Sequence, residues 1–363
     1  MVEPARVAAG RVTTAPPLLG DAPAETPPAP AGAKGRDRSR RTAAARMAGR
    51  RLLFAVPVVL AVSVGVFAAA AASPFDPLAG YLGDRYLTAS QAAQDELAAQ
   101  LGTDRPWFEQ YLSWLGNLVT GDLGTSRSFG QPVADVLAER LPWTLLLVAV
   151  ALLLAVVLAL GLGTWTAAHR GGWVDRLVTP GCLLLQGLPP FVVALGAVAV
   201  FGIGLAWLPV AGLTDAGADL SVGQVARHLV LPALVLALSQ LPWLLLNVRQ
   251  SLLRALTEDH VTGARARGLA ERTVVARHAL PTALLPFVTL LGARLPELVV
   301  GAVLVEEVFS WPGLAQAVVT SATELDFPLL AFLTLLTTVA VLVGSLVADV
   351  AYVLLDPRVA ADG

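Results

Sequence analysis

The sequence has little charge, one cysteine and one lysine among its 363 residues. Charged residues make up 14% of the chain, well below the roughly 25% of soluble domains, and hydrophobic residues make up 56%. The lone Cys182 excludes an internal disulfide framework and a cysteine-based metal cluster. The lone Lys34 is followed by Gly35, so the chain lacks the Gly-Lys-Ser/Thr sequence of a phosphate-binding loop. The composition predicts a membrane protein that is not itself a P-loop ATPase.

The apolar residues form runs that are long enough to cross a membrane. About 20 apolar residues span a hydrocarbon core of roughly 30 Å. We expect six transmembrane helices, at residues 52–72, 142–168, 177–205, 228–248, 284–305 and 327–350. Pro189 and Pro190 interrupt the third run and predict a kink there. The predicted fold class is an all-α membrane protein.

The segment before the first apolar run is rich in Pro, Ala and Gly and ends in a cluster of arginines. Because it has no apolar periodicity, residues 1–50 are predicted to be a disordered basic tail. Arg50 and Arg51 followed by an apolar run also fit a twin-arginine secretory signal. The run is long for a signal core and more spans follow it, which favours a retained first helix.

Arginines gather before the first span, between spans two and three, and between spans four and five. All three places lie on one side of a six-span protein, so the positive-inside rule puts both termini in the cytoplasm. Residues 73–141 carry few arginines and have helical spacing, and we expect them to form a small external helical segment. The transmembrane domain then covers residues 51–358, and residues 359–363 form a C-terminal tail.

The loop at residues 249–286 is the most basic interior segment of the chain. Arg249–Thr262 can form a helix leaving span four, while Gly263 and Gly268 each weaken a helix by about 1 kcal/mol relative to Ala. Helical spacing resumes at Glu271–Ala279. From its pattern alone, this loop is equally suited to docking a protein partner and to contacting anionic lipid.

The spacing in this loop resembles the EAA loop of permease subunits of binding-protein-dependent ABC importers. That pattern is EAA, three residues, Gly, nine residues, a hydrophobic residue, any residue, then Leu-Pro. The corresponding positions here are Thr262-Gly263-Ala264, Gly268, His278 and Leu280-Pro281. Three further segments resemble the dipeptide, oligopeptide and nickel branch of that family: Gly102–Ser126, Val305–Val318 and Asp349–Arg358.

The resemblance implies a non-catalytic permease of a bacterial cytoplasmic membrane that forms half of a translocation pathway, most simply for peptides. Its implied partners are a second homologous permease, two ATP-binding subunits, an external solute-binding protein and membrane lipid, with no nucleic acid. ATP is bound by the partner subunits, so no cofactor is expected in this chain.

The resemblance also assigns residues to the contact with the ATP-binding subunit. They are Thr262, Gly263, Ala264, Arg265, Ala266, Arg267 and Gly268, followed by Leu280 and Pro281, with Arg265 and Arg267 as charge partners for the ATPase. The chain departs from the pattern in carrying Thr262 and Gly263 where the family has Glu and Ala. His278 replaces a hydrophobic residue, and Ala270 stands where related permeases often have a serine cap, a loss of roughly 1 kcal/mol of local helix stability.

Arg294 and Glu297 place two charges inside the fifth span, where each costs at least about 2.5 kcal/mol. Their spacing puts them on one helical face. Either they form a self-satisfied ion pair buried in the bundle, or they line the transport pathway. They also support an alternative function, an ion- or proton-coupled secondary transporter, although no clear repeat accompanies them. A membrane-anchored external domain is a third alternative, but it leaves five spans unexplained.

Two other groups of polar residues receive simpler interpretations. His169, His228, His260 and His278 lack ligand spacing, so no metal site is predicted. Glu306 and Glu307 end the fifth span, where we expect solvent to surround them.

Overall fold

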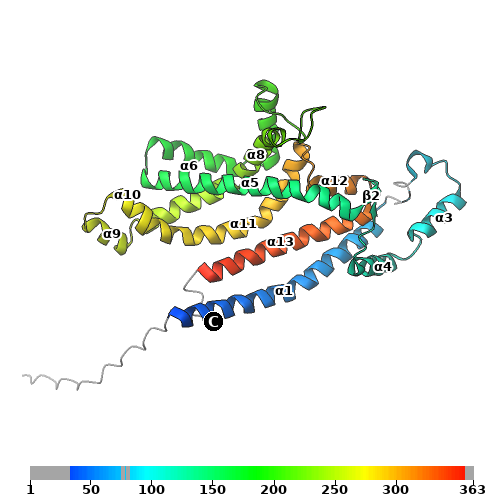
Figure 1. Ribbon diagram of the computed structural model, residues 1–363, viewed down its shortest axis with the longest axis horizontal. Helices are drawn as coiled ribbons and strands as arrows, with labels where there is room; N and C mark the ends of the chain where they lie inside the picture. The colour runs from blue at the N-terminus through cyan, green and yellow to red at the C-terminus, as the bar shows by residue number, and fades with distance from the viewer. Residues whose placement is uncertain (1–32, 75–77, 79–81, 356–363) are drawn as a thin grey trace, which may run out of the picture.

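The computed structural model describes residues 33–74, 78 and 82–355. In this part of the chain, long helices lie side by side in an elongated bundle (Figure 1). Helices α9 and α10 lie at one end of the bundle, together with the start of α1 and the end of α13. Helices α3, α4 and α12 lie at the opposite end, beside the short strands (Figure 1). We refer to these as the α9 end and the α4 end.

Five long helices build the bundle: α1 (Ala33–Ala71), α5 (Val133–Ala168), α8 (Val222–Ala255), α11 (Leu280–Val308) and α13 (Phe327–Leu355). The shorter helices are η1 (Gly83–Arg85), α3 (Gln91–Leu101), α4 (Trp107–Thr120), α6 (Trp173–Gln186), α7 (Pro190–Ala197), η2 (Val198–Gly204), α9 (Asp259–Ala266), α10 (Glu271–Thr273), η3 (Val274–Ala279) and α12 (Leu314–Thr323). Strands β1 (Thr125–Ser126) and β2 (Gln131–Pro132) form an antiparallel hairpin in which Thr125 pairs with Pro132.

In the described residues, five helices are long and apolar enough to cross a membrane. Helix α6 together with α7 and η2 is apolar enough to make a sixth, broken span, and the two parts meet at a bend of 114°. The predicted all-α membrane fold is confirmed. The interruption at Pro189 and Pro190 is a sharp break rather than a kink, because two successive prolines remove the N–H groups that would continue α6 into α7.

Two predicted boundaries are wrong. Residues 33–50 were predicted to be disordered but belong to α1, since alanine and arginine are both strong helix formers. Helix α5 begins at Val133, before the predicted start at residue 142, because Val133 and Val136 are buried against α12 and α13. The segment between the first two spans therefore ends at Pro132. The predicted tails at residues 1–32 and 359–363 lie outside the described residues.

Helices α5 and α8 pack against each other at the centre of the bundle. Ala151, Ala155, Ala159 and Gly163 recur every fourth residue of α5, and all four are buried. A Cβ atom on Gly163 would lie 2.9 Å from Cβ of Val248 on α8, closer than real carbon contacts allow. Small residues at this spacing allow the two helix backbones to approach closely, and this contact sets the position of α8.

At the α4 end, a buried carboxylate holds the hairpin to the start of α13. The Ser126 hydroxyl donates to Oδ2 of Asp326 at 2.6 Å, and the Ser128 N–H donates to the same oxygen at 3.0 Å. The Asp326 side chain is almost fully buried, so these bonds compensate for its removal from water.

Glu306 is fully buried, which corrects the prediction that solvent surrounds it. Its carboxylate accepts hydrogen bonds from the Thr144 hydroxyl at 2.6 Å and from the N–H groups of Ala315 and Gln316 at 2.8 and 3.2 Å. The residue that precedes α12, Gly313, has no side chain to cap that helix. Glu306 therefore supplies the acceptor that the free N–H groups at the start of α12 require.

Candidate coupling site

The short helix α9 forms the tip of the α9 end (Figure 1). Helix α8 ends at Ala255, so the predicted continuous helix over Arg249–Thr262 is wrong. The Thr257 hydroxyl donates to the Arg254 carbonyl at 2.7 Å, and Glu258 then adopts an extended conformation before α9 starts. These local conformations separate α9 from α8 and give it a direction of its own.

One side of α9 is anchored in a small apolar core. Val261 and Ala264 are fully buried. They belong to a cluster that joins α5, α8, α9, η3 and α11, whose other buried members are Ala167, Leu252, Ala255, Val274, Val275, Ala279 and Ala283. The loop is therefore a packed unit, and a force on α9 acts on the ends of three long helices.

The opposite side of α9 is exposed and has small side chains. Thr262, Gly263 and Ala266 are exposed there. A Cβ atom on Gly263 would have no heavy atom within 4 Å, so the surface above it is open. A short helix without bulky side chains on its outer side can approach a partner surface closely, which is what docking requires.

Arg265 forms its side-chain hydrogen bonds within the loop itself, and its expected role as a charge partner for the ATPase stays a prediction. Its Nε and Nη2 atoms donate to the two carboxylate oxygens of Glu271 at 3.1 and 2.6 Å, and its Nη1 atom donates to the Leu256 carbonyl at 3.0 Å. The hydrogen bonds that Arg265 donates to the Glu271 carboxylate raise the pKa of Arg265. Arg265 thus ties α9 to the end of α8 and the start of α10.

Other arginines surround α9 without such partners. Arg267, Arg272 and Arg277 are exposed, and none of their guanidinium groups forms a hydrogen bond or ion pair with a residue that the structure describes. The role expected for Arg267 stays a prediction, and Arg272 and Arg277 are additional exposed positive charges beside it. Sequence reasoning placed Arg272 and Arg277 in the basic loop but did not single them out.

The remaining predicted contact residues connect α9 to α11. Gly268 has φ of +79°, a left-handed conformation that favours glycine, and it ends the α9 turn. Ala270, the residue before α10, makes no side-chain cap, because alanine has no hydrogen-bond acceptor in its side chain. Leu280 and Pro281 form the first turn of α11, where proline is tolerated. The structure thus brings all nine predicted contact residues into one unit, although Ala264 is buried within it.

Arg294 and Glu297 form an ion pair within α11. The Arg294 guanidinium also lies over the ring of Trp243 on α8, at 4.1 Å from its centre. Arg294 is largely covered, with 17% of its side chain exposed, whereas 57% of the Glu297 side chain is exposed. The pair is therefore not enclosed by this chain alone.

Glu297 lies in an exposed stripe that follows one side of α11. The stripe consists of Thr289, Ala293, Glu297, Val300 and Leu304, spaced three or four residues apart. A carboxylate in the middle of such a stripe does not suit contact with lipid tails, since charges within spans face protein or water.

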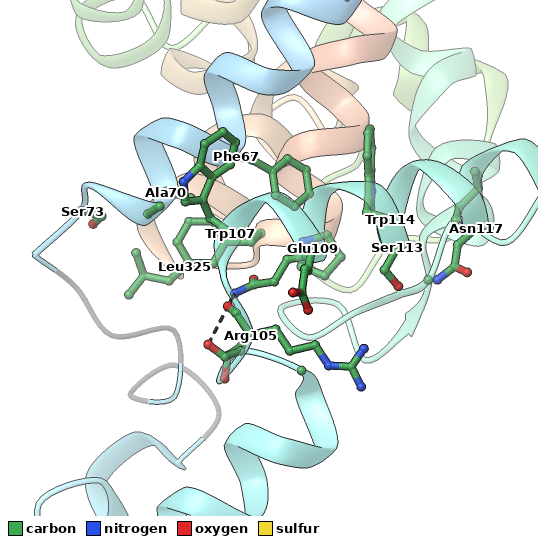
Figure 2. A pocket seen from close by; sticks show the side chains of 18 of the residues that line it. Phe67, Ala70, Ser73, Arg105, Trp107, Glu109, Ser113, Trp114, Asn117 and Leu325 are labelled. Carbon is green, nitrogen blue, oxygen red and sulfur yellow. Dashed lines mark hydrogen bonds between the residues drawn. The ribbon is translucent and has the colours of Figure 1, made fainter.

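A cavity of about 720 Å³ lies at the α4 end, between α1, α4 and the start of α13. Figure 2 shows Phe67, Trp107 and Trp114 around it, with Arg105 and Glu109 at its edge. Among the cavity-lining residues that the structure describes, no buried charge without a partner marks a binding site for a defined ligand, and the cavity is remote from α9 (Figure 1).

Comparison with known proteins identifies the family. Residues 159–361 match the family model described as binding-protein-dependent transport system inner membrane component. The chain is 34% identical over 311 residues to an oligopeptide transport system permease protein of Bacillus subtilis, covering 85% of this chain and 98% of that protein. It is 37% identical over 327 residues to a probable D,D-dipeptide transport system permease protein of Escherichia coli strain K12, covering 85% and 95%.

A third relative is a di/tripeptide transport system permease protein of Pseudomonas aeruginosa, at 33% identity over 328 residues, with 85% and 97% covered. The matches extend over nearly the whole of each relative, so they concern the complete permease and not a shared fragment. The chain belongs to the family of inner membrane components of binding-protein-dependent transport systems, and it is a multi-pass permease subunit of an ABC importer.

Proposed function

We propose that this permease imports peptides and that α9 is its docking element for a separate ATP-binding subunit. The observation that carries the docking proposal is the two-sided character of α9. Val261 and Ala264 are buried in the core that joins the long helices, while Thr262, Gly263 and Ala266 form an open outer surface. A partner that binds this surface would move α9 and, through the core, the ends of α5, α8 and α11.

The complex that we propose contains this chain, a second homologous permease, two ATP-binding subunits and an external solute-binding protein. ATP binds to the partner subunits, and this chain is non-catalytic. The α9 end then faces the cytoplasm, which agrees with the exposed Arg267, Arg272 and Arg277 there and with the positive-inside rule. Because α1 begins and α13 ends at the α9 end, both termini are cytoplasmic in this arrangement.

The peptide assignment rests on the names of the relatives, which are oligopeptide, D,D-dipeptide and di/tripeptide permeases. Cells that lack this chain should lose uptake of a labelled oligopeptide and regain it when the chain is restored. Normal peptide uptake in the deleted strain, with no change on restoration, would exclude peptides as the substrate.

Docking is tested by cross-linking in a cysteine-free background. Cys182 is the only native cysteine, so Cys182→Ala removes it. Gly263→Cys on α9 should cross-link to a cysteine in the ATP-binding subunit, whereas Asn117→Cys, exposed on α4 at the other end of the molecule, should not. Equal cross-linking at both positions, or none at residue 263, would contradict docking on α9.

We also propose that the exposed stripe of α11 faces the translocation pathway between the two permeases. The exposed Glu297 supports this position, because a carboxylate at that depth requires water or protein around it. Trp243 holds the Arg294 guanidinium beside it, so the pathway wall would carry both charges on one side.

A further inference from the structure

An ion pair that the sequence did not indicate joins α6 to α8 near the α9 end. Arg249 donates from Nε to Oδ1 of Asp175 at 2.7 Å and from Nη2 to Oδ2 at 3.0 Å. Both side chains are largely covered, with 16% of Arg249 and 8% of Asp175 exposed. Two parallel bonds between a planar guanidinium and a carboxylate fix their relative orientation as well as their distance.

Asp175 is also fixed on its own side of the contact. Its Oδ2 atom accepts from the Gly171 N–H at 2.9 Å, and its Oδ1 atom accepts from the Thr179 hydroxyl at 2.8 Å. Asp175 lies in the first turn of α6, where the helix dipole favours a carboxylate. The carboxylate is therefore rigidly attached to α6 and to the turn before it, and a displacement of Arg249 would be passed to both.

Arg249 in turn leads to α9. It lies on α8, which ends six residues later at Ala255, and the next carbonyl, that of Leu256, accepts the hydrogen bond from Arg265. A continuous series of contacts thus runs from α9 through Arg265 and the end of α8 to Arg249 and Asp175. It ends on α6, the first half of the broken third span, whose second half departs at 114°.

The chemistry of this contact suits transmission better than stability. A buried ion pair often stabilises a fold no more than apolar side chains of the same size would, but it defines how two elements are placed relative to each other. Apolar packing between α6 and α8 would allow the helices to slide, whereas a two-bond fork does not.

We propose that Asp175 and Arg249 are positioning residues that carry the displacement of α9 to α6 and so link ATP hydrolysis to opening of the pathway. This proposal rests on the proposed docking of the ATP-binding subunit on α9. It predicts that loss of the ion pair separates ATP hydrolysis from the movement of the third span.

The test uses the assembled transporter with Cys182→Ala and Leu188→Cys, which places a thiol at the exposed bend between α6 and α7. In the parent, ATP should change the rate at which a maleimide labels residue 188. Asp175→Asn keeps the size of the side chain and removes its charge, and Arg249→Lys keeps the charge and removes the fork. In both, the ATP-dependent change should shrink about ten-fold, as expected for a coupling energy within the usual range, while complex assembly and ATP hydrolysis persist.

Three controls make the result specific. Combining Asp175→Arg with Arg249→Asp should restore part of the labelling change. Asp349→Asn removes an ion pair with Arg51 that joins α1 to α13, away from this series of contacts, and should leave labelling unchanged. Cross-linking from Gly263→Cys should persist in Asp175→Asn.

Several results would overturn the proposal: an unchanged ATP response in Asp175→Asn, parallel loss of assembly and hydrolysis without rescue by charge exchange, or no ATP response in the parent. Failure of the residue 263 cross-link in the parent would instead remove the docking on which it rests.

Discussion

Two glycines of the coupling loop have opposite conformational requirements. Gly268 has a left-handed backbone, whereas Gly263 lies inside α9 with open space above it. We expect Gly268→Ala to destabilise the permease by about 1 kcal/mol, because a residue with a Cβ atom is sterically strained at the φ of +79° that Gly268 adopts. Gly263→Ala should instead be neutral or stabilising by up to about 1 kcal/mol, since alanine is the better helix former. Thermal unfolding of the detergent-solubilised permease compares them, and a larger loss in Gly263→Ala would contradict this conformational assignment.

Glu306 and Glu307 are adjacent in sequence and differ in environment. The Thr144 hydroxyl and the Ala315 N–H donate to different oxygens of the Glu306 carboxylate. Glu306→Gln replaces one of these oxygens with an NH₂ group, which cannot accept, so we expect the permease to lose roughly 1–3 kcal/mol of stability. Glu307→Gln is the matched control, since Glu307 is exposed and should tolerate the change. The same unfolding measurement applies, and equal stability of the two variants would show that the buried carboxylate does not hold α12.

The exposed carboxylate of α11 gives a test of the pathway. If Glu297 lines it, Glu297→Gln should lower uptake or change the preference among peptides of different charge, with normal assembly and ATP hydrolysis. Val300→Ala, in the same exposed stripe, controls for a change of surface shape. Uptake and preference that stay intact after Arg294→Leu with Glu297→Leu would exclude the pathway role.

At the scale of the element, α9 departs from its family pattern at its outer surface. Thr262→Glu restores the glutamate of that pattern at an exposed position. We expect coupling between ATP hydrolysis and uptake to stay intact or to increase. A large loss of ATP-driven uptake in this variant, at normal expression, would show that the ATPase contact has been placed at the wrong residues.

At the scale of the whole molecule, transport should be driven by ATP and not by an ion gradient. Uptake should require a separate ATP-binding subunit and should be abolished by vanadate. In proteoliposomes supplied with ATP, an ionophore that collapses ion gradients should leave uptake nearly unchanged. Vanadate-resistant uptake that stops with the ionophore would instead indicate the secondary-transporter alternative.

Much of this architecture follows from the sequence. The length of the apolar runs determines the spans, because a helix of about twenty apolar residues matches the thickness of the hydrocarbon core of a bilayer. The prolines at 189 and 190 determine where the third span breaks, and the glycine and Leu-Pro spacing after Arg249 locates the coupling loop and its family. Each of these is a local property of a short segment, so it can be read without knowing what lies beside it.

The tertiary structure decided which polar residues are solvated and which hold the bundle together. Glu306, Arg265 and Asp175 look like ordinary charged residues at helix ends. Their partners Thr144, Leu256 and Arg249 lie on other elements, and from 9 to 162 positions away in the chain. Helix packing alone brings these groups within hydrogen-bond distance, because a hydrogen bond depends on the position and direction of both partners. Sequence therefore determined the spans and the family of this permease, and the packed structure decided which of its charges connect the spans.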